Sequence, residues 1–238
     1  MDIEWTPNPS IDLDAAAREL ASERRLQVQD FLTDDSAHSL HAAIASHSPW
    51  FVSFNEGPEN YEVLEADFDR IPASQRARFL QQVEERAGRQ FQYLFLQYYV
   101  TEMIRRGEGG EYPLNALQTL MNTPETIEIF RRLSGESEVR EVDVMVSRYD
   151  RGHFLMQHDD SHASRDRVAA YVLNLTPEWR ADWGGHLAFF DEIGNIERAL
   201  VPRFNTLNMF LVPQQHSVQM VAPFAPKSRM SITGWLHR

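Results

Sequence analysis

The residues best suited to carry chemistry lie in one short stretch, Gln157-His158-Asp159-Asp160. It ends the apolar run of residues 154–156, and such a run favours an extended strand. On a strand, side chains two positions apart leave the same face, so His158 and Asp160 could contact a single metal ion. By itself this spacing is a weak signal, because a histidine and an aspartate in a loop often only hydrogen-bond to each other.

A third metal ligand has to come from a distant part of the chain, and His216 is our candidate. It follows the apolar segment Leu207–Val212 across Pro213, and it precedes a segment that carries an arginine. Two imidazoles and one carboxylate on one side of an ion form a facial triad, which leaves coordination positions open and is typical of non-haem Fe(II) oxygenases. The alternative ligands are His153, His162 and His186.

The arginine after His216 is the second feature of chemical interest. Arg229 and Ser231 alternate along a predicted strand near the C-terminus, so both side chains point the same way. A guanidinium beside a hydroxyl is suited to bind a carboxylate through paired, charge-assisted hydrogen bonds. The alternative is a solvated arginine near the end of the chain. The order of the His-x-Asp pair, His216 and Arg229 favours a carboxylate receptor.

Composition narrows the classes of site and partner. The chain has 238 residues and no cysteine, which excludes disulfides and thiolate metal sites and leaves His, Asp and Glu as metal ligands. A formal net charge of −12 argues against direct binding of nucleic acid, because an acidic surface repels phosphate. The sequence shows neither a signal peptide nor an apolar run of about 18 residues. We therefore expect a soluble cytoplasmic protein that does not enter membranes.

From about residue 138 onward, short β-branched runs follow one another closely and are separated by Gly, Pro, Asn and Asp turns. This spacing predicts a double-sheet jelly roll, in which strands pair around two packed sheets. The eight predicted strands are Val142–Tyr149, Phe154–His158, Val168–Leu175, His186–Phe190, Ile196–Val201, Leu207–Val212, Ser217–Val221 and Met230–Leu236.

The first half of the chain reads as mainly helical. The pattern predicts helices over residues 12–25, from residues 33–36 through 45, over 74–106, and in the region 114–133, where Gly135 ends the last one. Short strands are predicted at residues 28–32 and 50–54, and the second is followed by a loop. The expected fold is therefore α+β: a single domain of residues 1–238 whose double-stranded β-helix (jelly-roll) core, 138–238, is buttressed by the N-terminal helices of residues 1–137.

Taken together, these segments resemble the Fe(II)/2-oxoglutarate-dependent oxygenases, and within them the prolyl hydroxylases. The resemblance covers residues 139–238 well, and the first half only loosely through residues 31–34 and the helix that follows. It is carried by residues 149–160, 171–175, Trp179, 184–187, 202–207, 216–218 and 229–235. It implies iron bound by His158, Asp160 and His216 in the core of a single oxygenase domain.

The resemblance also implies a place for the co-substrate. Arg229 would hold the distal carboxylate of 2-oxoglutarate, assisted by the phenol of Tyr149, and strand geometry adds Ser231. Trp235 matches a tryptophan near the pocket floor of related enzymes, whereas Val172 stands where the family often has a second tyrosine. Asp160 separates the chain from halogenating relatives, because these lack the carboxylate.

The activity implied by the resemblance is hydroxylation of a C–H bond with O₂, releasing succinate and CO₂, with ascorbate as a candidate reductant. We expect the substrate to be a prolyl residue in a protein partner. Arg165 and Arg167, between the metal motif and the next strand, are candidate substrate contacts together with Trp235; both arginines could equally be solvated charges. The loop of residues 107–113 is a candidate lid, although most such loops are plain connectors.

Two other functions fit the sequence less well. The same chemistry could act on a free amino acid or another small molecule, which predicts succinate formation with metabolites and no mass change in any protein. A non-catalytic, cupin-like binding protein is the third reading, and the intact set of His158, Asp160, His216 and Arg229 argues against it. A zinc protease is disfavoured because the chain lacks the HExxH motif. The sequence does not determine the oligomeric state.

Overall fold

The computed structural model describes residues 3–161 and 166–238. The α-helices are α1 (Leu13–Glu23), α2 (Asp34–His47), α3 (Glu65–Arg70), α4 (Ala73–Ala87), α5 (Val100–Arg105), α6 (Ala116–Met121) and α7 (Pro124–Ser134), with 3₁₀ turns η1 (Pro113–Asn115) and η2 (Ala181–Trp183). The strands are β1 (Arg25–Val28), β2 (Phe51–Glu56), β3 (Glu59–Leu64), β4 (Tyr93–Tyr98), β5 (Glu141–Val142), β6 (Met145–Tyr149), β7 (Phe154–His158), β8 (Arg167–Asn174), β9 (Leu187–Phe190), β10 (Ile196–Leu200), β11 (Thr206–Leu211), β12 (His216–Val218) and β13 (Arg229–His237).

These strands form one antiparallel sheet that rolls up into the predicted jelly roll. The hydrogen-bonded order is β1-β11-β8-β13-β6-β4-β7-β12-β9-β10, and the β2–β3 hairpin is added beside β4. The two ends of this path meet, because Arg25 on β1 forms an ion pair with Glu197 on β10 and its guanidinium lies 5.1 Å from the ring centroid of Phe189 on β9. The barrel is thus nearly closed, and a double-stranded β-helix core is confirmed.

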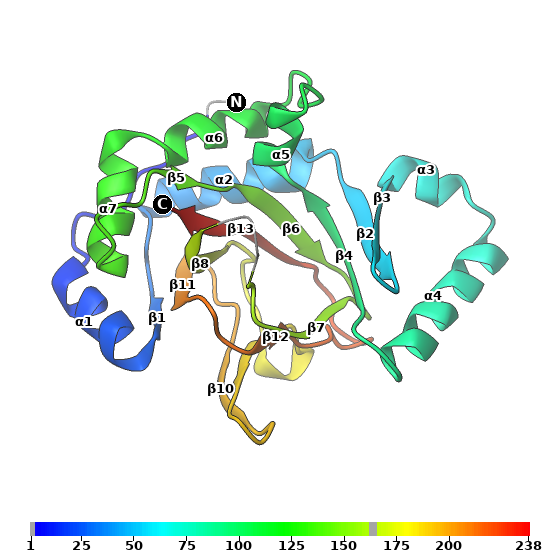
Figure 1. Ribbon diagram of the computed structural model, residues 1–238. Helices are drawn as coiled ribbons and strands as arrows, with labels where there is room; N and C mark the ends of the chain where they lie inside the picture. Colours follow the sequence, from blue (N-terminus) through cyan, green and yellow to red (C-terminus); the bar gives the residue numbers. More distant parts are fainter. Residues whose placement is uncertain (1–2, 162–165) are drawn as a thin grey trace.

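The helices cover one side of this roll. Figure 1 shows α2, α5, α6 and α7 together above the sheet, whereas α3 and α4 lie beside the β2–β3 hairpin at the other end. Leu40 of α2 and Phe130 of α7 are fully buried in one apolar cluster with Tyr171 of β8. The helix α7 ends at Gly135 in a left-handed conformation (φ 73°), as predicted. The N-terminal helices therefore buttress the jelly roll as expected.

Each of the eight strand segments predicted after residue 138 contains a strand. In the first half, however, the expected helix over residues 74–106 is wrong. Helix α4 stops at Ala87, residues 93–98 form the strand β4, and α5 covers only Val100–Arg105. The run from Phe91 to Tyr98 is so rich in apolar side chains that its positions fit a helical period as well as a strand. Hydrogen bonding of β4 to β2, β6 and β7 stabilises the strand over the helix.

Two smaller expectations also differ. The predicted strand at 28–32 lies a few residues earlier, at β1, where it pairs with β11. The loop expected after residue 54 is the turn of a hairpin, whose second strand is β3. The first 137 residues are thus less helical than predicted: they supply β1 to β4, of which β1 pairs with β11 and β4 pairs with β6 and β7 in the second half of the chain. No helix in the described ranges is long and apolar enough to span a bilayer.

Candidate metal centre

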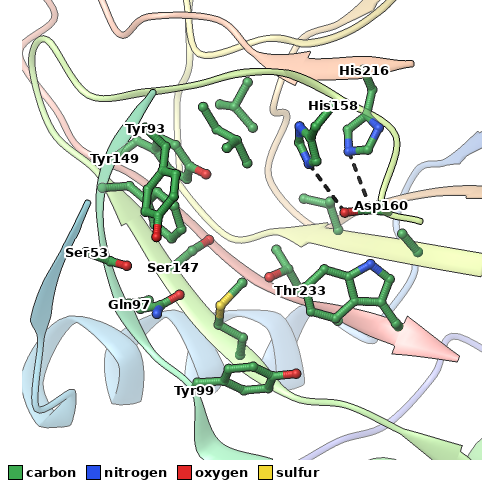
Figure 2. A pocket seen from close by; sticks show the side chains of 18 of the residues that line it. Ser53, Tyr93, Gln97, Tyr99, Ser147, Tyr149, His158, Asp160, His216 and Thr233 are labelled. Carbon is green, nitrogen blue, oxygen red and sulfur yellow. Dashed lines mark ion pairs between the residues drawn. The ribbon is translucent and has the colours of Figure 1, made fainter. Parts of the chain in front are cut away.

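The three predicted metal ligands come together at one end of the barrel. His158 ends β7 and His216 begins β12, and the two residues are direct partners in the antiparallel pairing of these strands. Asp160 follows β7 in a left-handed conformation (φ 62°), which turns its carboxylate back toward them. Its two oxygens lie 3.3 Å from His158 Nε2 and 3.4 Å from His216 Nε2 (Figure 2). One donor atom from each residue lies within 4.8 Å of the others.

Backbone carbonyls fix the orientation of both imidazoles. His158 Nδ1 lies 2.9 Å from the carbonyl oxygen of Met156, and His216 Nδ1 lies 2.7 Å from that of Gln214. Because a carbonyl can only accept, each Nδ1 carries the proton in the neutral ring, and each Nε2 turns a lone pair toward Asp160. Two lone pairs and a carboxylate that face one another are the donor set of a metal, so the residues fit a divalent cation.

Charge in the triad also suits a cation. Burial lowers the pKa of His216 to about 4, so this ring is neutral at physiological pH. Burial opposes the charged form of Asp160, but the hydrogen bond that a protonated His158 donates to it and the attraction of protonated imidazoles prevail and lower the pKa of Asp160 to about 2. Burial likewise disfavours charge on His158, yet the hydrogen bond and charge of Asp160 raise the pKa of His158. The carboxylate is therefore ionised across the physiological range.

The triad lines a cavity of about 680 Å³ that extends inside the roll. One wall is a row of alternate side chains from β4 and its flanks, and the neighbouring strands β6 and β13 continue it. Figure 2 shows Gln97 and Tyr99 at the end of this cavity away from the triad. The row on β4 consists of Phe91, Tyr93, Phe95, Gln97 and Tyr99.

Arg229 lines the same cavity and is 1% exposed. No carboxylate among the described residues pairs with it: its nearest polar contact is Nη2 donating to Asn174 Oδ1 at 3.4 Å, and its Nε has no partner in this part of the chain. The guanidinium carbon lies 5.1 Å from the ring centroid of Tyr149. Burial lowers the pKa of Arg229. Because burying an unpaired charge is costly, this geometry suits an anionic ligand in the cavity.

The other predicted co-substrate contacts divide into two groups. Tyr149 lines the cavity, stacks on Phe95 with ring centroids 4.9 Å apart, and has its pKa raised by burial, so its phenol keeps its proton. Ser231 is fully buried and does not line the cavity; its hydroxyl lies 2.9 Å from that of Ser147, which does. On the same face of β13, Thr233 reaches the cavity instead, as the alternation that suggested Ser231 could also have indicated.

Two of the three predicted substrate contacts belong to the described residues, and both lie in the same cavity as the triad. Trp235 and Arg167 both line the cavity, and the guanidinium carbon of Arg167 stacks 3.7 Å from the indole centroid. Arg167 Nη1 also donates to the backbone oxygen of Asp160 at 3.2 Å. The indole of Trp235 helps to lower the pKa of Asp160, although its N–H meets no described partner with full hydrogen-bond geometry. Arg165 lies outside the described residues.

The rival metal ligands are not part of the triad where they are described. His153 Nδ1 accepts from the backbone N–H of Asp150 at 3.1 Å, and His186 Nδ1 lies 3.2 Å from Gln219 Oε1. His162 lies outside the described residues. The row on β4 is the part of the site that the sequence pattern does not predict, because that pattern indicates a helix over residues 74–106. No local signal separates strand from helix here, because residues 91–98 are apolar at most positions.

Comparison with known proteins bears directly on this site. A family model described as "2OG-Fe(II) oxygenase superfamily" matches residues 144–237, which include the triad and Arg229. The match shows that this segment of the chain is similar to the 2OG-Fe(II) oxygenase superfamily. The description of this model names Fe(II) and 2OG, and the donor set of His158, Asp160 and His216 and the buried Arg229 fit these two groups.

Two similar curated proteins are named as prolyl hydroxylases. The chain is 35% identical over 103 residues to "Prolyl 3-hydroxylase OGFOD1" of Xenopus laevis, a match that covers 40% of this chain and 20% of the relative. It is 30% identical over 134 residues to the Mus musculus protein of that name, covering 52% and 23%. The chain therefore spans about a fifth of the length of these relatives.

Solved oxygenase structures share the fold. A Pseudomonas putida prolyl-4-hydroxylase aligns with a TM-score of 0.60 at 18% identity, covering 95% of this chain and 98% of that one. A Trichoplax adhaerens prolyl hydroxylase in complex with a hypoxia inducible factor oxygen degradation domain peptide fragment aligns with a TM-score of 0.62 at 16% identity, covering 94% and 88%. At these identities the likeness shows that the whole chain has the oxygenase architecture.

Proposed function

We propose that this chain is an Fe(II)- and 2-oxoglutarate-dependent dioxygenase that hydroxylates a C–H bond of a prolyl residue in a protein and releases succinate and CO₂. The single observation that carries the proposal is the buried guanidinium of Arg229, which has no carboxylate partner among the described residues and opens on the same cavity as the triad. A cation awaiting a carboxylate beside a metal donor set is what a keto-diacid co-substrate requires.

The residues of the chain would divide the work as follows. His158, Asp160 and His216 hold Fe(II), which supplies the activation of O₂. Arg229 binds the distal carboxylate of 2-oxoglutarate through charge-assisted hydrogen bonds, and Tyr149, whose phenol stays protonated, is placed to donate one more. Apolar side chains on the cavity wall, among them Leu155 and Val218, exclude water from the co-substrate.

The shape of the cavity favours a peptide over a free amino acid. The row of cavity-lining side chains runs from Phe91 to Tyr99, which at about 3.3 Å per residue corresponds to roughly 26 Å of strand. The row begins beside the triad, where the ring centroids of Phe91 and His158 are 6.1 Å apart. A wall of this length accommodates several residues of extended chain. The names of the curated relatives support prolyl hydroxylation as the particular reaction.

The test measures co-substrate consumption and protein modification together. Iron-loaded protein is incubated with 2-oxoglutarate, O₂, ascorbate and lysate of a strain that lacks the protein; succinate is quantified and proteins are searched for a +16 Da shift on proline. Asp160→Ala should abolish both signals because it removes the only carboxylate of the triad. Asp159→Ala is the matched control, since Asp159 is not a member of the triad and, within the described residues, its Oδ1 accepts from the backbone N–H of Ser161 at 2.9 Å.

The outcomes separate the candidate functions. Succinate formation with metabolite mixtures, and no mass change in any protein, would favour a small-molecule hydroxylase. Absence of turnover and of 2-oxoglutarate binding in folded, iron-loaded protein would leave only a binding role. Full activity of Asp160→Ala would overturn the assignment of the metal ligands.

A further inference from the structure

The neighbour of Arg229 explains how a buried cation can stay unpaired, and this inference rests on the proposed function. We infer that Asn174 is a positioning residue that orients Arg229 while leaving its charge uncompensated, so that the site selects a keto acid with a second carboxylate. Asn174 lies at the end of β8, is fully buried, and does not itself line the cavity. It therefore acts on a ligand only through Arg229.

The hydrogen bonds of Asn174 determine which way its amide points. One side of the amide faces the backbone carbonyl of Thr206, which can only accept, so Nδ2 must lie there and donates at 3.2 Å. The other side faces the guanidinium of Arg229, which can only donate, so Oδ1 must lie there and accepts from Nη2 at 3.4 Å. Strand pairing fixes both contacts, because Asn174 is the direct register partner of Thr206 on β11 and of Ser231 on β13.

A second contact shapes the space that the arginine occupies. A Cβ added to Gly185 would lie 3.2 Å from Arg229 Cδ and 3.2 Å from Val221 Cγ2, and the glycine has φ +65°. Glycine thus leaves room for the arginine stem on one side, while the amide of Asn174 holds the guanidinium on the other. Together they fix where the charge lies without adding a charge of opposite sign.

The neutrality of Asn174 is the important property. An aspartate would have nearly the same shape and would place a carboxylate at the same hydrogen-bonding position, where it would pair with Arg229 inside the protein. A ligand carboxylate would then meet a guanidinium that is already neutralised. Val172, two residues earlier on the same face of β8, lines the cavity and has no donor to compensate for that loss. Recognition of the second carboxylate therefore depends strongly on the charge of Arg229.

The experiment compares two keto acids of equal chain length on the Mn(II)-loaded protein. Binding of 2-oxoglutarate and of 2-oxopentanoate, which lacks the distal carboxylate, is measured by calorimetry for wild type, Asn174→Asp and Asn174→Ala. Wild type should prefer 2-oxoglutarate. Asn174→Asp should weaken 2-oxoglutarate binding by at least about 10-fold, leave 2-oxopentanoate nearly unchanged, and so remove most of the preference. Asn174→Ala should weaken it less, because the charge of Arg229 persists.

The order of the two variants separates charge from packing. If Asn174 were only a packing residue, the isosteric aspartate would be tolerated better than alanine, and the two keto acids would be affected alike. Asn208→Asp is the matched control: Asn208 is a buried asparagine on the neighbouring strand β11, and its Oδ1 accepts from Gln27 Nε2 at 2.9 Å. This control should keep the preference for 2-oxoglutarate. Mn(II) affinity, measured separately, should be unchanged in Asn174→Asp and shows that the triad is intact.

Each result bears on one proposal or the other. If wild-type protein binds Mn(II) but shows no preference for 2-oxoglutarate over 2-oxopentanoate, the proposed function fails. If wild type shows the preference and Asn174→Asp retains it, the function stands and the role of Asn174 is refuted.

Discussion

Replacing Arg229 by methionine should make the protein more stable and remove co-substrate binding at the same time. The guanidinium is 1% exposed and has no counter-ion among the described residues, so folding pays a desolvation penalty of several kcal/mol for it. Methionine removes the charge and, being flexible, fills much of the vacated volume. The substitution therefore stabilises the folded state by removing the cost of burying the charge.

The unfavourable side follows from the contacts that disappear. The hydrogen bond to Asn174 is long, at 3.4 Å, and contributes about 1 kcal/mol or less. The interaction with the face of Tyr149, at 5.1 Å, contributes roughly 1 kcal/mol. Because the desolvation penalty that Arg229→Met removes is larger than the contacts it loses, we expect this variant to be more stable by about 1–2 kcal/mol. For a chain of this size that raises Tm by roughly 2–8 °C.

Scanning calorimetry of the Mn(II)-loaded protein with and without 2-oxoglutarate measures both effects. At a ligand concentration 100 times the wild-type Kd, wild type should gain about 2.7 kcal/mol of stability from binding, whereas Arg229→Met should gain much less because it lacks the contact to the distal carboxylate. Arg229→Lys serves as a control, because it keeps the buried charge and should show no stabilisation in the absence of ligand. A lower Tm for Arg229→Met together with an undiminished ligand effect would mean that Arg229 is a structural residue, and the reasoning would be refuted.

Two further predictions concern stability away from the co-substrate. Burial lowers the pKa of His153 to about 4, so the stability that its neutral form contributes is complete above pH 6.5, its ordinary value, and is lost as pH falls toward 4. His153→Gln should remove roughly 2–3 kcal/mol of this pH dependence in denaturant titrations across that window, and an unchanged slope would contradict it. Gly234→Ala would place a Cβ 1.9 Å from the backbone oxygen of Asp143 and should destabilise by about 3 kcal/mol or more, whereas Gly88→Ala, with no such atom closer than 3.6 Å, should be nearly neutral in the same melts.

The parts of the fold that could be predicted are those in which local pattern and long-range pairing agree. After residue 138 the strands are short, β-branched and separated by turn residues, so strand and turn signals coincide and each predicted segment contains a strand. The segment from Phe91 to Tyr98 lacks this agreement. Its side chains are apolar at nearly every position, and only the partners β2, β6 and β7 select the strand over the helix. A sequence cannot display those partners.

The same distinction applies to the site. The spacing of His158 and Asp160, and the order in which His216 and Arg229 follow, were enough to bring four residues to one cavity before any coordinates were considered. Ser231 was placed on the correct face of β13, but alternation says nothing about depth, and its hydroxyl turns to Ser147 rather than to the cavity. The face of a strand on which a side chain lies follows from local alternation. Whether that side chain reaches the cavity depends on how the neighbouring strands pack.

The triad and Arg229 share a physical feature that links fold to function. In both places a buried polar group is held rigidly by neutral partners: carbonyl oxygens fix the imidazoles of His158 and His216, and an amide fixes the guanidinium of Arg229. Neutral partners supply orientation without satisfying charge, so the attraction of the triad for a cation and of Arg229 for a carboxylate remains available to ligands. A substitution that introduces charge among these partners should therefore cost binding even where it preserves shape and folding. Because shape and charge can be varied separately at Asn174, that residue distinguishes a site built for ligands from one that merely tolerates polar groups.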